Sequence, residues 1–203
     1  MLGPLSNTIQ GVINFTWPMI IISMVIIVSF RITYLIKNHQ KLVLYKELPM
    51  LICIVYILCL FQVVTFQDDV SWSSNNFIPF KEIFRYNVTS RLFIKNVLGN
   101  MIMFLPFGFF ASYYLKADKI TLPLILTLTA SIAVEIVQMC IGRVFDVDDI
   151  ILNLLGGTAG FYIYVVFYKI IAKLPKFCHS EWFLDILAVL LSAGLITLIV
   201  MII

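Results

Sequence analysis

Charged residues are scarce in this sequence. Only 12% of its 203 residues are Asp, Glu, Lys or Arg, whereas a soluble domain carries about 25%. Apolar residues make up 62% of the chain, and the mean hydropathy is +1.03. This composition excludes a disordered chain and an ordinary cytosolic enzyme, and the small net charge of +3 gives no reason to expect a nucleic acid as partner. We therefore predict an integral membrane protein.

Cysteine and histidine are also few, and neither has the spacing of a site. The two histidines, His39 and His179, fall in predicted loops far from any acidic cluster, and the chain has no phosphate-binding glycine loop, nucleophile elbow or zinc-helix motif. The four cysteines show neither metal-ligand nor disulfide-framework spacing; they are Cys53, Cys59, Cys140 and Cys178. We expect these thiols to be ordinary packing residues and one loop thiol, and we expect no metal or other cofactor.

Apolar runs long enough to cross a bilayer occur along the whole chain. A spanning helix needs about 20 such residues, and the runs lack the alternation of barrel strands. The predicted fold is all-α, a polytopic membrane helix bundle that forms a single integral membrane domain over residues 1–203. No Lys or Arg precedes the first run, so we expect a retained helix rather than a removed signal peptide. The six predicted transmembrane helices are residues 11–36, 48–66, 97–115, 120–141, 150–171 and 182–203.

The distribution of positive charge predicts the orientation of these helices. Of the 14 Lys and Arg residues, nine flank one face of the predicted bundle and five flank the other. Because cytoplasmic loops carry the excess of Lys and Arg, we assign the face with nine to the cytoplasm. Both termini, residues 67–96 and the turn at residues 142–149 are then predicted to be extracellular.

Polar residues near the membrane gather at the predicted outer ends of the third, fourth and fifth spans. In the third span, Asn96 and Asn100 are four residues apart and therefore share a helix face, with Gly99 beside them. Glu135 and Gln138 in the fourth span also share a face. A charged acid at the bilayer centre costs about 2.5–3.5 kcal/mol on insertion scales, so such a group normally faces a polar interior, pairs with a partner or stays protonated. We favour a functional or site-organising role for Glu135 over an incidental one.

Three more carboxylates lie just before the fifth span. Asp146, Asp148 and Asp149 follow Arg143 in the turn, and Asn153 lies one turn into the helix. A helix cap explains one of these acids but not the whole group. The candidate ligand-binding or site-organising residues are Asn96, Asn100, Glu135, Gln138, Arg143, Asp146, Asp148, Asp149 and Asn153.

Glycine and proline in the same spans indicate how the helices pack. Gly156 and Gly160 form a small-xxx-small pair, which is typical of a close helix contact. This contact would bring the polar start of the fifth span toward Glu135. Pro106, followed by Gly108, can kink the third span and free a carbonyl near its middle.

Structural explanations of the same residues stay open. Glu135 would pair with Arg143, or accept a hydrogen bond from Asn100, and only hold helices together. The aspartates would form a solvated turn in which Asp148 or Asp149 caps the helix. The oxygen atoms would also suit a divalent cation, but the spacing matches no EF-hand loop. We therefore predict no metal and keep a cation as the alternative.

In their order along the chain, these motifs resemble those of the VanZ-like membrane proteins, a family named after a protein associated with teicoplanin resistance. The resemblance covers residues 76–160 as a core, with flanking transmembrane helices in residues 1–66 and 182–203. Each motif alone is weak, whereas their order is specific. Besides the polar candidates given above, the matching residues are Asn76, Pro79, Phe80, Gly99, Pro106, Gly108, Gly156 and Gly160.

The resemblance implies a multi-pass protein of the bacterial cell membrane that lowers susceptibility to teicoplanin or related lipoglycopeptides. We expect a binding protein rather than an enzyme, in which an outward-facing acidic and amide cleft binds the antibiotic or a lipid-linked peptidoglycan precursor amid membrane lipids. One alternative is a membrane enzyme that modifies an envelope lipid or headgroup, with Glu135 and an aspartate as acid and base. A transporter ranks last, because an intramembrane acid is its only hint. The sequence does not predict the oligomeric state.

Overall fold

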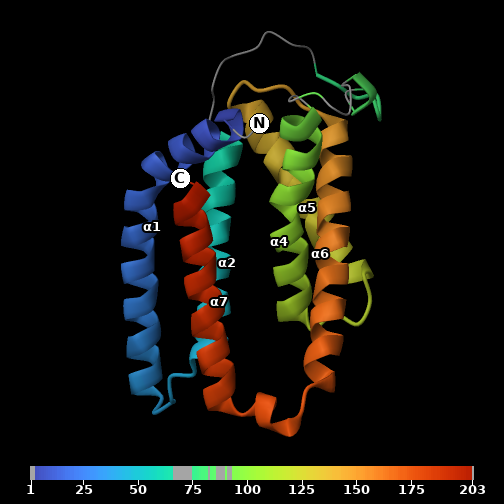
Figure 1. Ribbon diagram of the computed structural model, residues 1–203. Helices are drawn as coiled ribbons and strands as arrows, with labels where there is room; N and C mark the ends of the chain where they lie inside the picture. The colour runs from blue at the N-terminus through green and yellow to red at the C-terminus, as the bar shows by residue number, and fades with distance from the viewer. Residues whose placement is uncertain (1–2, 66–74, 82, 86–89, 91–92, 203) are drawn as a thin grey trace. The chain divides into compact units, whose positions relative to one another are not determined.

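The computed structural model describes residues 3–65, 75–81, 83–85, 90 and 93–202 (Figure 1). All regular elements in this part of the chain are helices, as predicted. In chain order they are α1 (Gly3–Lys37), α2 (Leu44–Thr65), the short η1 (Ile83–Arg85), the π-helical η2 (Ile94–Leu98), α4 (Gly99–Leu115), α5 (Thr121–Cys140), α6 (Val147–Lys173), the short η3 (Lys176–His179) and α7 (Glu181–Ile202).

Five segments among the described residues are long and apolar enough to cross a membrane. They agree with the first five predicted spans to within a few residues, apart from the start of the first. The five are Trp17–Lys37, Leu44–Thr65, Asn96–Leu115, Thr121–Cys140 and Val147–Lys173. The sixth predicted span corresponds to α7, which is a helix of 22 residues. Its crossing of the membrane and the side on which the termini lie stay predictions.

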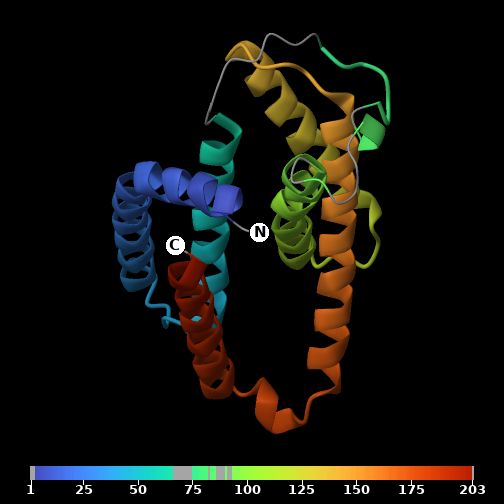
Figure 2. The same cartoon turned by 45° about the horizontal axis from the view of Figure 1, so that its top comes forward.

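The first helix is longer than the sequence predicted. It begins at Gly3 and runs for 35 residues, whereas the apolar run begins at residue 11. Figure 2 shows that α1 changes direction along its length, and Pro18 lies inside it. A proline lacks the N–H that would bond the carbonyl four residues earlier, and its ring crowds that carbonyl, so a helix bends there. Within α1, residues Trp17–Lys37 are long and apolar enough to cross a membrane.

The described residues form two compact units. One contains α1, α2 up to Val63, η3 and α7, and the other contains residues 64–172 of the described chain, including α4, α5 and most of α6. The predicted core, residues 76–160, falls within the second unit. The predicted flanking helices supply most of the first.

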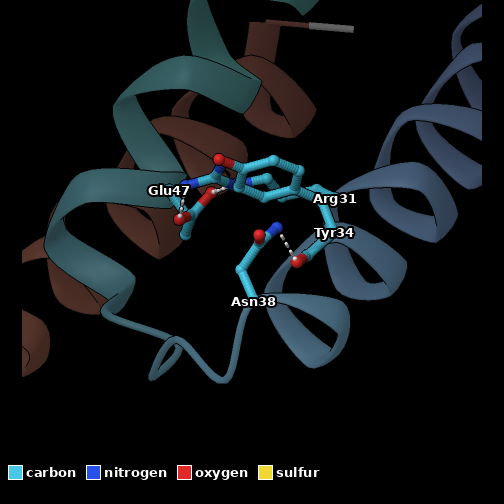
Figure 3. A network of polar contacts seen from close by, with 4 residues as sticks. All are labelled: Arg31, Tyr34, Asn38 and Glu47. Atoms are coloured by element: carbon cyan, nitrogen blue, oxygen red, sulfur yellow. Dashed lines mark hydrogen bonds and ion pairs between the residues drawn. The ribbon is translucent and has the colours of Figure 1, made fainter.

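Polar contacts join the helices of the first unit at the α1–α2 connection (Figure 3). Arg31 on α1 donates two hydrogen bonds to Glu47 on α2, from Nε to Oε2 at 2.8 Å and from Nη2 to Oε1 at 2.7 Å. The guanidinium carbon also lies 5.4 Å from the centre of the Tyr34 ring. The backbone N–H of Tyr45, in the first turn of α2, donates to the carboxylate of Asp185 on α7 at 2.7 Å. Such bonds satisfy groups that would otherwise be unpaired near a helix end.

Glycines allow α4 and α6 of the second unit to touch backbone to backbone. A Cβ atom at Gly156 or Gly160 of α6 would come within 2.1 Å of a carbonyl oxygen of α4, and one at Gly108 would lie 2.0 Å from the carbonyl oxygen of Gly157. The neighbour of the small-residue pair is therefore α4. This helix stays α-helical through Pro106. The contact fixes the ends of the two helices relative to each other, and the candidate site lies at their first turns.

Candidate functional site

The site begins with a loop, residues 75–81 and 83–85, which we call the aromatic loop. Asn76 in this loop forms an isolated parallel β-bridge with Asp146, just before α6. Its N–H donates to the carbonyl of Phe145 at 2.8 Å, and its carbonyl accepts from the N–H of Val147 at 3.1 Å. The Asn76 side chain is 5% exposed and donates to the Asp146 carboxylate at 2.8 Å. A segment about 70 residues earlier in the chain is thus fastened to the start of α6.

Asp146 caps the helix that follows it. Its Oδ1 accepts the backbone N–H of Asp148 at 2.9 Å, two residues on, as an N-cap side chain does. The structural alternative in which Asp148 or Asp149 caps the helix is therefore wrong. Asp146 is the N-cap because it is the residue directly before the first helical residue, Val147.

Asp148 holds the aromatic loop instead. Its carboxylate is 1% exposed and accepts the backbone N–H of Phe80 at 2.5 Å and that of Ile83 at 3.2 Å. Phe80 has a φ of +66°, in the left-handed region that non-glycine residues seldom occupy. A bond from its N–H to a buried carboxylate stabilises that backbone conformation. The solvated turn considered from the sequence is therefore wrong for Asp148.

Glu135 supports the turn from the neighbouring helix α5. Its side chain is 1% exposed, and Oε2 accepts the backbone N–H of Asp146 at 2.9 Å. Gln138, in the orientation that satisfies both of its neighbours, donates to Glu135 Oε1 at 3.0 Å and accepts from Arg143 Nη1 at 3.1 Å. Arg143 also donates to the carbonyl of Val64 at 3.0 Å. In place of the direct Glu135–Arg143 pair, which was one of the structural alternatives, a relay runs through Gln138.

Two further contacts join α6 to the other helices of the unit. Asn100 of α4 donates through Nδ2 to Asp149 Oδ1, so Asn100 contacts Asp149 rather than Glu135. Asn153 is 1% exposed and donates to the hydroxyl of Ser131 on α5 at 3.0 Å. The Oδ1 atom of Asn153 has no hydrogen-bond partner among the described residues. Amide and carboxylate groups thus fasten all three helices at one end of the unit.

Most of the sequence-predicted polar residues meet in this network, while three other predicted residues lie at its edge. Asn96 is in the π-helical turn η2, ahead of α4, and is half-buried. Pro79 is an exposed residue of the aromatic loop. Gly99 stands at the junction of η2 and α4, where a Cβ would have 3.8 Å of space to its nearest neighbour. Gly99 is therefore not a close-contact glycine, in contrast to Gly108.

Sequence reasoning missed several partners. Ser131 had a signal that was available: with Thr127 and Glu135 it forms a polar row at four-residue spacing along α5, and all three are buried. Asn75, whose Oδ1 accepts the N–H of Phe145 at 3.0 Å, had no such signal. Ile83 also had no signal in the sequence, because it contributes only a backbone N–H.

The carboxylates of this network act as hydrogen-bond acceptors for N–H groups. Its described carboxylate contacts go to backbone amides or to Asn and Gln side chains, which favours rigid positioning of the turn and the loop. In the described part of the chain, no group of three or more His, Cys, Asp or Glu side chains is placed to hold a metal ion. The described residues therefore offer no set of ligands for the divalent cation that the sequence left as an alternative.

Comparison with known proteins agrees with the motif resemblance. No curated protein and no solved structure matches this chain. The profile of the VanZ/LLP1 family, in contrast, matches residues 50–168. This stretch contains α4, α5, most of α6, the aromatic loop and every residue of the buried network. It spans more than half of the chain, and we conclude that this membrane-type helical protein belongs to the VanZ/LLP1 family.

Proposed function

We propose that this protein lowers the susceptibility of a bacterial cell to teicoplanin or related lipoglycopeptides by binding the antibiotic or a lipid-linked cell-wall precursor at the α4–α6 end that carries the aromatic loop. Membership in the VanZ/LLP1 family supports the physiological role. The observation that supports the location is the fastening of the loop by Asp148, whose buried carboxylate accepts the N–H groups of Phe80 and Ile83. A rigid surface loop loses less conformational entropy on binding than a mobile one.

Within this proposal the buried acids organise the site, and exposed groups contact the ligand. Glu135 and Asp148 are each only 1% exposed, and both are occupied by backbone N–H donors. A ligand that reached them directly would have to displace these bonds, and unpaired buried amides cost about 1–3 kcal/mol each. Exposed residues of the aromatic loop, such as Lys81 and Phe84, need no such displacement.

The test is teicoplanin susceptibility in a host that lacks the protein. Complementation with the wild type should lower susceptibility, whereas Asp148→Asn and Glu135→Gln should lose most of the protection at equal membrane levels. Asp118→Asn, which changes an exposed acid between α4 and α5, is the matched control and should protect like the wild type. Full protection by both Asp148→Asn and Glu135→Gln would show that the network has no part in this function.

Binding is measured separately on purified protein in nanodiscs. Saturable binding of teicoplanin or of lipid-linked precursor should occur with the wild type and weaken with Asp148→Asn. If neither ligand binds, the binding mechanism is wrong even where protection is seen. Mass spectra of envelope lipids and precursor from cells with and without the protein should be identical; a new lipid species would instead favour the enzyme alternative.

A further inference from the structure

The aromatic loop exposes a high proportion of large apolar side chains. Phe77 is 67% exposed, Ile78 63%, Phe80 50% and Phe84 83%. These residues lie outside the membrane-spanning helices, where exposed apolar side chains would otherwise face water. Exposed apolar side chains gathered in one short loop mark a contact with a partner or a membrane.

The exposure does not arise from a loosely attached loop. Asn76 is bonded to the backbone on both sides of Asp146, and Asp148 accepts two N–H groups farther along the loop. The Phe77 ring also stacks on Phe145, with 5.4 Å between the ring centres. Since several buried polar groups fix the backbone in place, the outward direction of the apolar side chains is a property of the fold.

The level of the loop relative to the membrane follows from the same contacts. Asn76 pairs with Asp146, and the membrane-spanning stretch of α6 begins at the next residue, Val147. The loop is therefore level with the first turn of a spanning helix, which is where hydrocarbon gives way to lipid headgroups. Aromatic side chains are enriched at this depth because one end of the ring is accommodated by lipid and the other by water.

The charges in the loop fit the same partner. Lys81 and Arg85 are exposed and alternate along the chain with the exposed apolar residues Phe80 and Phe84. Lysine and arginine at the membrane surface are attracted to lipid phosphates, by about 1 kcal/mol each on an anionic surface. A second protein would have to match both this charge and the membrane level, whereas a lipid surface supplies both by its nature.

From these contacts we propose that the aromatic loop is an interfacial membrane anchor, whose apolar side chains enter the headgroup region of the adjacent leaflet and whose cations contact lipid phosphates. The anchor holds the start of α6 at a fixed depth. It does not depend on the proposed binding of antibiotic or precursor, because it requires only a bilayer.

Tryptophan fluorescence in nanodiscs tests the depth of the loop. Phe84→Trp is placed in a background without native tryptophan, which requires Trp17→Phe, Trp72→Phe and Trp182→Phe. We expect bromine atoms attached high on the lipid chains to quench this residue more strongly than bromines near the bilayer centre. Ile132→Trp, at a partly exposed site near the middle of α5, is the membrane reference and should show the opposite preference. A soluble tryptophan amide is the water reference and should be quenched by iodide alone.

The outcomes are distinct. If Phe84→Trp behaves like the soluble amide, the loop lies in water and the anchor is wrong. If neither bromolipid nor iodide quenches it, protein covers the loop, either a second copy of this chain or another partner, and the anchor is again wrong. Ile78→Trp in the same background repeats the measurement at a second site, so that one poorly folded variant does not decide the result.

A separate measurement tests the contact between the cations of the loop and lipid phosphates. Quenching of Phe84→Trp should be stronger when the bromines are carried by anionic lipids than by zwitterionic ones in the same mixture. This preference should disappear when Lys81→Gln and Arg85→Gln are added. No difference between the two carriers would overturn the contact with lipid phosphates. Teicoplanin and precursor are absent from these samples, so failure here is separate from failure of the proposed function.

Discussion

At the scale of single residues, Asp148 shows how a buried acid is accommodated next to a membrane. An isolated carboxylate would be costly to bury. Here the side chain lies in the first turn of α6, where the helix dipole favours negative charge, and it accepts two backbone N–H groups from the aromatic loop. These interactions offset the cost of burial and make the position of the loop depend on one side chain.

Replacing this carboxylate by its amide should therefore destabilise the protein. In Asp148→Asn only one oxygen is left to accept, and an NH₂ group faces the other N–H donor. Leaving a buried N–H unpaired costs about 1–3 kcal/mol. We expect a lower thermal unfolding temperature in detergent and faster proteolysis in the aromatic loop. Asp118→Asn should unfold like the wild type, and equal unfolding temperatures for the two variants would contradict the role assigned to Asp148.

The sequence could identify Asp148 as a member of a site but not its role. Asp146, Asp148 and Asp149 all lie within four residues at a helix start, and each has the same signals for capping. Their roles differ because side chains at successive helix positions point about 100° apart. One therefore bonds its own helix, one bonds the loop and one bonds Asn100.

At the scale of elements, the pairing of α4 and α6 depends on the absence of side chains. Gly160→Ala would place a Cβ 2.1 Å from the carbonyl oxygen of Leu105, so the two helices would have to separate. Overpacking of this kind costs about 1–3 kcal/mol, and we expect a corresponding drop in the unfolding temperature. Separation would also lengthen the Asn100–Asp149 hydrogen bond.

Gly99→Ala is the matched control for this change. The same methyl group at Gly99 would lie 3.8 Å from its nearest neighbour, which is an ordinary contact distance. Alanine also has the higher helix propensity, by about 1 kcal/mol in soluble helices. Gly99→Ala should therefore be neutral or stabilising. If both alanine variants unfold at the same temperature, the close approach of α4 and α6 does not limit stability.

Element boundaries were the most predictable feature of the fold. Long apolar runs bounded by polar residues predicted α5 and α6 to within a few residues, because a helix in lipid must bond its own backbone groups. The extension of α1 to Gly3 and the π-helical turn η2 were not predicted. Both are backbone conformations of short stretches, for which hydropathy has no signal.

At the scale of the whole molecule, the orientation prediction gives a direct test. In a background with the native cysteines changed to serine, Lys81→Cys lies in the aromatic loop and Lys119→Cys lies between α4 and α5, and both sites are exposed. A membrane-impermeant maleimide should label Lys81→Cys in intact cells and Lys119→Cys only after permeabilisation. The opposite pattern would reverse the orientation derived from the positive charges. Labelling of both sites in intact cells would mean that no spanning segment separates them.

The sequence by itself determined the solvent, the helices and the family. Scarce charge and long apolar runs suffice for the solvent and the helices, because the cost of burying unpaired polar groups in lipid leaves few other structures. The order of the polar, glycine and proline motifs indicated the family. Tertiary structure decided which polar groups meet: the aromatic loop reaches Asp148, Asn100 reaches Asp149, and Gln138 separates Glu135 from Arg143. Such contacts in the second unit join residues up to 79 positions apart, and they depend on helix rotation and loop path, which no local pattern encodes.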